Sequence, residues 1–419
     1  MKKVSYTLGI LSLMVSMASC SDTVNQEIEL EIDPSTNLSQ QEMAICYIVQ
    51  TEGKFKFKAD NQFNLGVGLP VPPEIHPDSA CLVWQSVRGS ISEVSLYTSE
   101  LIDEGEPYIK FTVEQASGNA LIAALEGEEI VWSWHIWMPE SPVEAVATST
   151  GYEVMNMNLG AMNATPGDPA AYGMLYQWGR KDPFPASETP TGDTSTVGAP
   201  LYDIEGNPVS IVNSSWYSNE VNTIGYSIAN PTVCLSNFSQ YSKSRDWLAE
   251  SDDSLWGNPQ GDVKDPSTGN FANKGRKTCY DPSPAGWRVA PADAFADFTT
   301  SGGYAWDFVD FKLYDANKDG NINLDDYSYG WQFIVGQNTP VYFPAAARYD
   351  GSYAMLMGSM SGLWGNYWSN APYSGIPGGA FCNLSFQIAN QKGQKEISVS
   401  PSAGSSRADA FSIRCVRDK

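Results

Sequence analysis

The chain of 419 residues contains only two histidines, His76 and His135. Two are too few for a three-histidine metal site, and His135 lies in a run of tryptophans that is typical of a buried core position. Gly-x-Ser-x-Gly, His-Glu-x-x-His and Walker motifs are absent. Carboxylates are abundant, but the sequence singles out no pair for the acid–base chemistry of a glycosidase. The sequence therefore predicts that the protein is not an enzyme.

Basic residues are also scarce. The chain has 25 Lys and Arg against 48 Asp and Glu, which gives a formal net charge of -23. A surface of this sign disfavours nucleic acid and anionic lipid headgroups as partners. With 12% aromatic residues, 36 glycines and 26 prolines, the composition is typical of loop-rich β structure rather than of a disordered chain. The length exceeds what one core usually supports and predicts two or three domains.

Long apolar runs are absent except near the start, where Tyr6–Met17 is apolar but too short to span a bilayer. The run ends in Met17-Ala-Ser-Cys20, which resembles a bacterial lipobox. We expect residues 1–20 to form a lipoprotein signal peptide and Cys20 to carry the lipid, so that only the lipid anchor contacts the membrane. The protein would then be exported and anchored to the outer membrane, facing the cell exterior. The alternative is an ordinary signal peptide cleaved near Ala18.

After a polar tether at residues 21–41, residues 42–145 alternate with a period of two between short turns. In the last strand, Trp132, Trp134 and Ile136 share one face, and the opposite face is also largely apolar, so this strand should be central. The spacing predicts an antiparallel β-sandwich. The candidate strands are Cys46–Val49, Lys54–Lys58, Cys81–Gln85, Ser92–Tyr97, Tyr108–Val113, Ala120–Ala124 and Ile130–Trp137.

A Pro- and Ala-rich connector at residues 141–151 precedes a region with several distinctive phrases. Three stand in a fixed order: Asp281-Pro-Ser-Pro-Ala-Gly-Trp-Arg-Val289, Gly365-Asn-Tyr-Trp-Ser-Asn370 and Ser412-Ile-Arg-Cys-Val-Arg-Asp418. Together with the upstream phrases Asn158–Gly160, Leu175–Phe184 and Leu255–Pro259, they resemble the Fibrobacter succinogenes major paralogous domain. The resemblance covers residues 151–419 and implies a C-type-lectin-like domain. We expect a mainly β chain with an α+β C-terminal part.

The resemblance implies a function as well as a fold. Members of that family are mostly surface lipoproteins, so we expect a binding or adhesion module whose partner is a glycan or a cell-surface protein. One alternative is a structural fimbrial tip or accessory subunit that contacts pilus subunits, for which Cys46–Val49 provides a faint similarity. Another is a cryptic enzyme of the same fold, because fold alone does not determine function.

The cysteine pattern lacks Cys-x-x-Cys, which argues against a zinc ribbon and a thioredoxin-like site. Family members usually carry a cysteine where this chain has Ser283, and Cys279 stands four residues earlier. The resemblance therefore implies a relocated disulfide between Cys279 and Cys415. The alternative is that both are buried free thiols. Apart from Cys20, the cysteines are Cys46, Cys81, Cys234, Cys279, Cys382 and Cys415.

Residues 315–326 match an EF-hand calcium loop at positions 1, 3, 5, 6 and 9, with Asp in place of Glu at position 12. Alternate side chains would turn oxygens inward, and Gly320 would permit the sharp bend. We expect one structural Ca²⁺ here, and the alternative is a simple Asp- and Asn-rich turn. The candidate ligands are Asp315, Asn317, Asp319, the Asn321 carbonyl, Asn323 and Asp326.

Aromatic rings stack on sugar faces, and exposed Trp and Tyr often indicate such sites. The stretch from Trp364 to Tyr373 combines aromatic residues with Gly, Ser, Asn and Pro, which predicts an exposed recognition surface. The ligand-binding candidates are Trp364, Asn366 and Tyr373, whereas Trp368 belongs to a family phrase and favours a core position. Residues 189–200 are a second, polar candidate loop. Residues 293–298 predict a short helix after Pro291.

Overall fold

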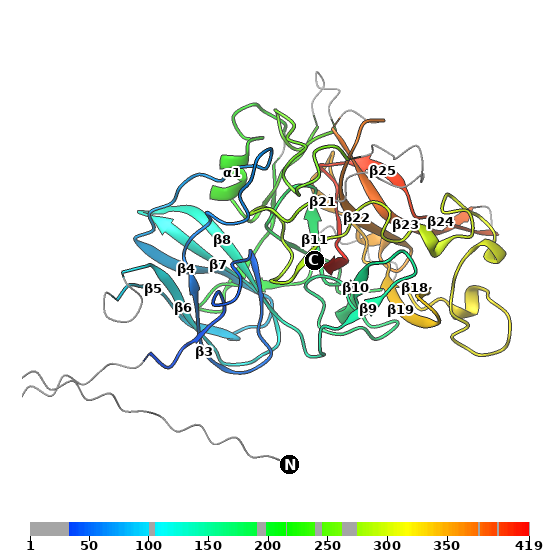
Figure 1. The fold of residues 1–419 in the computed structure, drawn as a ribbon, viewed down its shortest axis with the longest axis horizontal. Helices are drawn as coiled ribbons and strands as arrows, with labels where there is room; N and C mark the ends of the chain where they lie inside the picture. The colour runs from blue at the N-terminus through cyan, green and yellow to red at the C-terminus, as the bar shows by residue number, and fades with distance from the viewer. Residues whose placement is uncertain are drawn as a thin grey trace, which may run out of the picture. The chain divides into compact units, whose positions relative to one another are not determined.

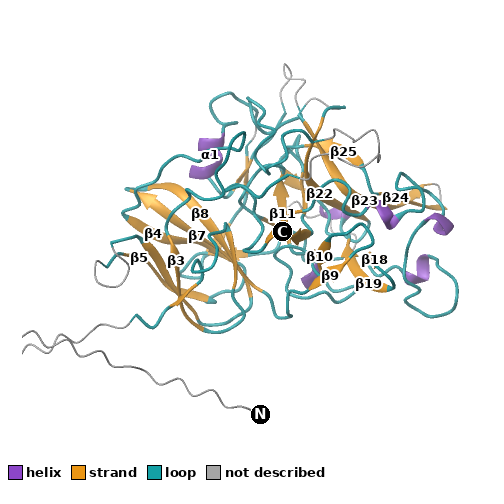
Figure 2. Cartoon of the chain, in the orientation of Figure 1, coloured by secondary structure: helices purple, strands orange, loops and turns teal. Residues whose placement is uncertain are grey.

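The computed structural model of the chain describes residues 33–99, 105–190, 198–214, 216–238, 245–261, 275–375, 378–391 and 394–418. The predicted signal peptide with Cys20, and the tether up to residue 32, lie outside them. Pro34–Lys419 form one compact unit. Strands hold 37% of the described residues against 6% in helices, which confirms the mainly β fold. Figure 2 shows these strands joined by long loops.

Two sheets form the first part of the unit (Figure 1). The first has the order β1 (Thr36–Asn37), β3 (Gly53–Lys58), β6 (Tyr108–Val113), β5 (Ile91–Tyr97). The second has the order β14 (Pro208–Val209), β13 (Leu201–Tyr202), β4 (Ser79–Gln85), β7 (Gly118–Glu126), β8 (Glu129–Met138), β2 (Cys46–Ile48). Each predicted strand of residues 42–145 is present, with ends that differ by at most two residues.

The two sheets share one apolar core because the alternation in each strand points alternate side chains toward the other sheet. Phe57 of β3 lies against Trp134 of β8, with 5.1 Å between their ring centroids. Trp132 and Ile136 lie in the same cluster. On the opposite face of β8, Trp137 is buried in a different cluster. The strand is therefore covered on both faces, as the sequence predicts.

The described residues of the later part of the chain form four further sheets. One has the order β17 (Trp287–Val289), β27 (Cys415–Arg417), β10 (Glu153–Met155), β9 (Ala145–Ala147). A larger one has the order β12 (Phe184–Pro185), β11 (Met174–Gln177), β26 (Ala410–Ser412), β22 (Trp364–Tyr373), β23 (Gly379–Gln391), β24 (Gln394–Ser400), with β20 (Tyr349–Asp350), β21 (Met355–Leu356) and β25 (Ala403–Ser406) beside it. Two pairs complete the set: β15 (Val212–Asn213) with β16 (Val233–Cys234), and β18 (Gly330–Val335) with β19 (Thr339–Pro344).

The early and late parts of the unit are joined by pairing and by buried polar contacts. Tyr202 of β13 pairs with Gln85 of β4. Ser133 of β8 donates a hydrogen bond to the Asp182 carboxylate (2.6 Å), which also pairs with the Lys181 ammonium (2.7 Å). These contacts join residues before the predicted connector at 141–151 to residues after it. The division into domains at residues 42–145 and 151–419 therefore stays a prediction.

Two of the three phrases singled out in the sequence meet at the chain end. Strand β27 lies between β17 and β10, so the phrase around Cys415 pairs with the phrase that ends at Val289. Just before β27, the buried Arg414 guanidinium donates to Asn158 Oδ1 from Nε (3.0 Å) and Nη2 (2.7 Å). It also reaches the carbonyl oxygens of Met155 (3.2 Å) and Tyr342 (2.7 Å). Burial lowers the pKa of Arg414 to about 10.

Helices are short throughout the described residues. The α-helix that the described residues contain, α1, begins after Thr223, whose side chain accepts a hydrogen bond from the Tyr226 N–H as an N-cap. The predicted helix at residues 293–298 is reduced to a single 3₁₀ turn, η2. The helical segments are α1 (Ile224–Ala229), η1 (Pro169–Ala171), η2 (Ala296–Phe298), η3 (Phe308–Asp310), η4 (Leu324–Asp326) and η5 (Gly358–Met360).

Candidate functional site

The predicted recognition stretch from Trp364 to Tyr373 is the strand β22, which lies between β26 and β23. Asn366 is buried and accepts a hydrogen bond from the Ser385 hydroxyl (3.0 Å). Trp364 and Tyr373 are half-buried. They stand at opposite ends of the ten-residue strand, about 30 Å apart at the rise of an extended chain. The structure therefore does not bring the three candidates together on one surface.

The physical reason is that small and polar residues in β22 serve close packing. A Cβ added at Gly365 would lie 2.2 Å from the Phe386 ring, so only glycine fits there. The Ser369 carbonyl accepts a hydrogen bond from the Trp178 indole (2.9 Å). Trp368 is fully buried, as expected, and stacks on Phe411 with 4.3 Å between the ring centroids. Gly, Ser and Asn here belong to a packed core and not to a loop.

Three other aromatic side chains are exposed on neighbouring segments. Trp216 is 63% exposed, Tyr353 is 61% exposed and Phe238 is 44% exposed. The rings of Trp216 and Phe238 lie 5.3 Å apart at 48°. Large aromatic side chains usually bury most of their area, so three exposed ones on adjoining segments are unusual. We call Trp216, Phe238 and Tyr353 the aromatic platform.

Backbone pairing places the platform. The parallel strands β15 and β16 run side by side, and the Tyr217 N–H donates to the Phe238 carbonyl (3.1 Å) at their far end. Three residues after β16, the Asn237 N–H donates to the Gly351 carbonyl (2.9 Å). The Asn213 amide donates to the Tyr353 carbonyl (3.2 Å). Three segments therefore lie side by side, and each carries one exposed aromatic residue.

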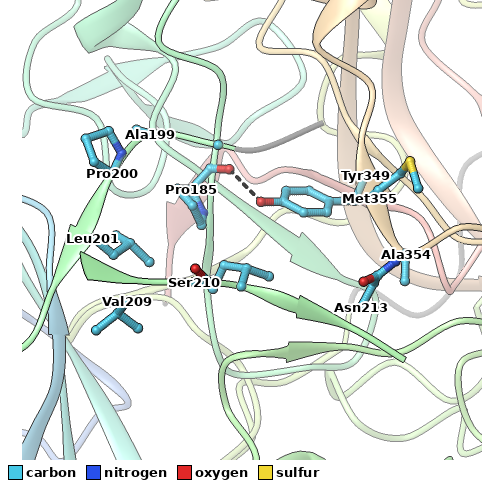
Figure 3. Close-up of a pocket in the computed structure, with 12 residues that line it drawn as sticks. Pro185, Ala199, Pro200, Leu201, Val209, Ser210, Asn213, Tyr349, Ala354 and Met355 are labelled. Atoms are coloured by element: carbon cyan, nitrogen blue, oxygen red, sulfur yellow. Dashed lines mark hydrogen bonds between the residues drawn. The ribbon is translucent and has the colours of Figure 1, made fainter. Parts of the chain in front are cut away.

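A pocket of about 190 Å³ adjoins the platform through Asn213 and Ala354 (Figure 3). In Figure 3, the Tyr349 hydroxyl points to the Pro185 carbonyl oxygen, to which it donates at 3.1 Å. Burial raises the pKa of Tyr349 well above its usual value, so this hydroxyl stays protonated. The lining residues are Pro185, Gly198, Ala199, Pro200, Leu201, Val209, Ser210, Ile211, Asn213, Tyr349, Ala354 and Met355. None of them is charged.

A second exposed aromatic pair lies elsewhere in the unit. Trp306 is 65% exposed and Tyr304 is 49% exposed, with 4.4 Å between the ring centroids. Between them, Ala305 is buried and pairs with Val399 of β24. The alternation of an extended segment thus places both rings on its outer side. Neither ring lines one of the five pockets found among the described residues, so Trp306 is a matched control for the exposed tryptophan of the platform.

The predicted calcium loop is closed by its own side chains. The Asp315 carboxylate accepts from the Asp319 N–H (3.2 Å) and the Gly320 N–H (2.8 Å). The Asp326 carboxylate, nearly buried, accepts from the Ala316 N–H (2.8 Å) and the Asn323 N–H (3.0 Å). Gly320 has φ +87°, the left-handed region that the bend requires.

The other predicted ligands follow the same alternation. Asn317 Oδ1 accepts from the Asp319 N–H (2.9 Å), Asp319 Oδ1 accepts from the Asn321 N–H (2.8 Å), and Asn323 caps the turn η4. Ile322 packs against a hydrophobic cluster, as predicted. Among the described residues, no three His, Cys, Asp or Glu side chains gather as a metal-binding group. Calcium binding by this Asp- and Asn-rich loop therefore stays a prediction.

The predicted disulfide between Cys279 and Cys415 is wrong. Both are free, buried thiols, and they lie in different hydrophobic clusters. The Cys415 thiol instead lies 3.2 Å from the hydroxyl of Ser283, to which it donates. Ser283 is the position at which the resemblance implies a cysteine. In the structure, the group that faces the Cys415 thiol is therefore a hydroxyl.

His135 is a core residue, as the sequence predicts. Its Nε2 lies 2.8 Å from Asn119 Oδ1, and its Nδ1 lies 3.4 Å from the Tyr176 hydroxyl. Burial lowers the pKa of His135 to about 3, so the imidazole is neutral at physiological pH. The neutral, fully buried ring orders Asn119 and has no access to a substrate.

Comparison with known proteins adds no identification. No family model, curated protein or solved structure matches the chain. None of the helices in the described residues has the length and apolar character needed to span a bilayer.

Proposed function

We propose that the protein is an exported, lipid-anchored binding module that recognises neutral glycans through the aromatic platform and the adjoining pocket. The carrying observation is that three exposed aromatic residues stand on adjoining segments beside an uncharged pocket, with two of their rings in contact. Aromatic faces stack on the C–H groups of a sugar ring, and exposed apolar patches bordered by polar groups often mark interaction sites. Asn213 and Ser210 provide hydrogen-bonding groups within the pocket.

The absence of charge in the pocket lining favours one class of ligand over others. Phosphates and carboxylates require Lys, Arg or oriented N–H groups, and the formal net charge of -23 repels anions. A neutral sugar needs only stacking surfaces and a few neutral polar groups. Individual sites of this kind are weak, and many copies on one cell surface would strengthen attachment.

Two parts of the proposal concern the protein's setting. The Met17–Cys20 sequence supports lipid anchoring, because the lipobox resemblance places an acylated cysteine at Cys20. The loop at residues 315–326 supports a structural role for Ca²⁺, because the Asp315 carboxylate already faces the loop, where it accepts from the Asp319 and Gly320 N–H groups. The calcium loop would order the module and would not contact the glycan.

A glycan array tests the proposal with the chain from residue 21 onward. We expect binding to one or more neutral glycans, and Trp216→Ala should weaken the binding by about 5- to 30-fold, equivalent to about 1–2 kcal/mol for one stacking ring. Trp306→Ala is the matched control, because it removes an equally exposed tryptophan elsewhere. If no glycan binds and the chain co-purifies with pilus subunits, the structural alternative replaces this proposal.

A further inference from the structure

A second and larger pocket lies between the first two sheets and the later part of the chain. Its volume is about 350 Å³, within the range of small-molecule sites. One side comes from the ends of β4 and β7, and from Glu140 just after β8. The other comes from residues 160–174 and 185–188. Residues 199–201 form a wall that it shares with the smaller pocket.

The pocket combines an apolar wall with charge of one sign. Met162, Met174 and Pro169 supply apolar surface, and Glu140 and Glu188 supply two carboxylates. Of the described residues, no lysine or arginine lines it. Neither carboxylate forms an ion pair within the part of the chain that the structure describes.

Glu140 is held in place while part of its carboxylate stays available. Its N–H donates to the Met162 carbonyl (2.9 Å), and its Oε1 accepts from the Ser117 hydroxyl (3.0 Å). Its Oε2 accepts no hydrogen bond from a described residue. The neighbouring Asn119 is already committed to His135 and to the Gly160 carbonyl (both 2.8 Å), so it does not compete for a ligand.

We propose that this junction pocket binds a small aliphatic amine in its protonated form. An ammonium group donates up to three hydrogen bonds and carries the charge that the two carboxylates leave uncompensated. The methylene chain would lie against the methionines, whose flexible side chains adapt to a linear alkyl group. The strongly negative protein would also raise the local concentration of cations.

This proposal is independent of glycan binding, because it uses a different pocket and an opposite ligand chemistry. The amine site depends on the two carboxylates, and the uncharged pocket beside the platform offers an alkylammonium no counter-charge. Failure of either proposal leaves the other standing.

Isothermal titration of the chain from residue 21 onward tests the amine site with n-hexylamine, 1,5-diaminopentane and hexan-1-ol at neutral pH. We expect both amines to bind at least tenfold more tightly than the alcohol, which has similar apolar area. Glu140→Gln and Glu188→Gln should each weaken amine binding by threefold or more, and the double variant by tenfold or more. Each exchange is nearly isosteric at an exposed position, so folding should be kept.

Glu52→Gln is the matched control, since it removes the same charge at an exposed position outside the pocket. We expect it to bind both amines as the unmodified chain does. Equal weakening by Glu52→Gln would mean that only net charge attracts the amines. The proposal would also be overturned if hexan-1-ol bound as tightly as the amines, or if neither amine bound at millimolar concentration in tenfold excess over the protein.

Discussion

Replacing Arg414 with methionine tests whether the buried arginine stabilises the packing of the chain end against the rest of the unit. The guanidinium donates hydrogen bonds to Asn158 Oδ1 and to the carbonyl oxygens of Met155 and Tyr342, and it lies 4.1 Å from the Phe343 ring centroid. Leaving one buried acceptor without a donor costs about 1–3 kcal/mol. Methionine would fill part of the volume with apolar contacts. We therefore expect Arg414→Met to lower the free energy of unfolding by about 3–5 kcal/mol.

Equilibrium unfolding in urea measures this loss, followed by tryptophan fluorescence and by circular dichroism with coincident transitions. Arg417→Met is the control because it makes the same chemical change three residues later. Arg417 is exposed, with its guanidinium 4.2 Å from the Trp287 ring centroid, so its loss should cost about 1 kcal/mol or less. Arg414→Lys should fall between the two. Equal losses for Arg414→Met and Arg417→Met would refute the role of the buried network.

Three further predictions follow from single sites. Burial raises the pKa of Asp281 above its ordinary 3.8, so its contribution to stability is fully present below pH 3.8 and is lost as the pH rises through the pKa of the folded state. Asp281→Asn should remove this loss, which urea unfolding between pH 4 and 7 measures. If the free energy of unfolding changes with pH equally in the variant and the unmodified chain, the prediction is wrong. Ser283→Cys should form a disulfide with Cys415 under oxidising conditions. The bond would close a 132-residue separation and add about 5 kcal/mol to the free energy of unfolding in the chain-entropy model. Mass spectrometry that finds both thiols free would count against it. Calcium at a hundred times its Kd should stabilise the chain from residue 21 onward by about 2.7 kcal/mol, and Asp319→Ala should abolish this stabilisation. If chelator leaves the melting temperature unchanged, the loop does not bind calcium and is a simple turn.

The strands of residues 42–145 could be predicted because their alternation is regular and their turns are rich in Gly, Pro and Ser. Tyr108–Val113 agrees with β6 at both ends. The two apolar faces of β8 identified it as a covered strand, and Trp134 and Trp137 lie in separate clusters. Local periodicity is a reliable guide where each face of a strand meets one uniform environment.

The same reasoning failed for β22, where composition suggested a loop. Gly365 is required by the ring of Phe386, and Asn366 is buried beside Ser385. Such needs arise from neighbours that are distant in sequence, so no local pattern reveals them. The disulfide prediction failed for a similar reason, because the residue that faces Cys415 is Ser283 and not Cys279.

The aromatic platform was not predicted because exposure is a tertiary property. Trp216 stands in a polar stretch, Asn213-Ser-Ser-Trp-Tyr-Ser, which is a weak sign of a surface position. Nothing in the sequence links it to Phe238 or Tyr353. Parallel pairing of β15 with β16, and the contact of Asn237 with Gly351, bring the three together only in the fold.

The central claim is that the aromatic platform holds a neutral glycan. Its most direct measurement is the Kd of the best array glycan for the Trp216→Ala/Tyr353→Ala double variant and for Trp306→Ala, by titration of the chain from residue 21 onward. We predict that the double variant binds at least 30-fold more weakly, equivalent to about 2 kcal/mol, and that Trp306→Ala binds as the unmodified chain does. Unchanged binding by the double variant, or equal weakening by Trp306→Ala, would contradict the claim.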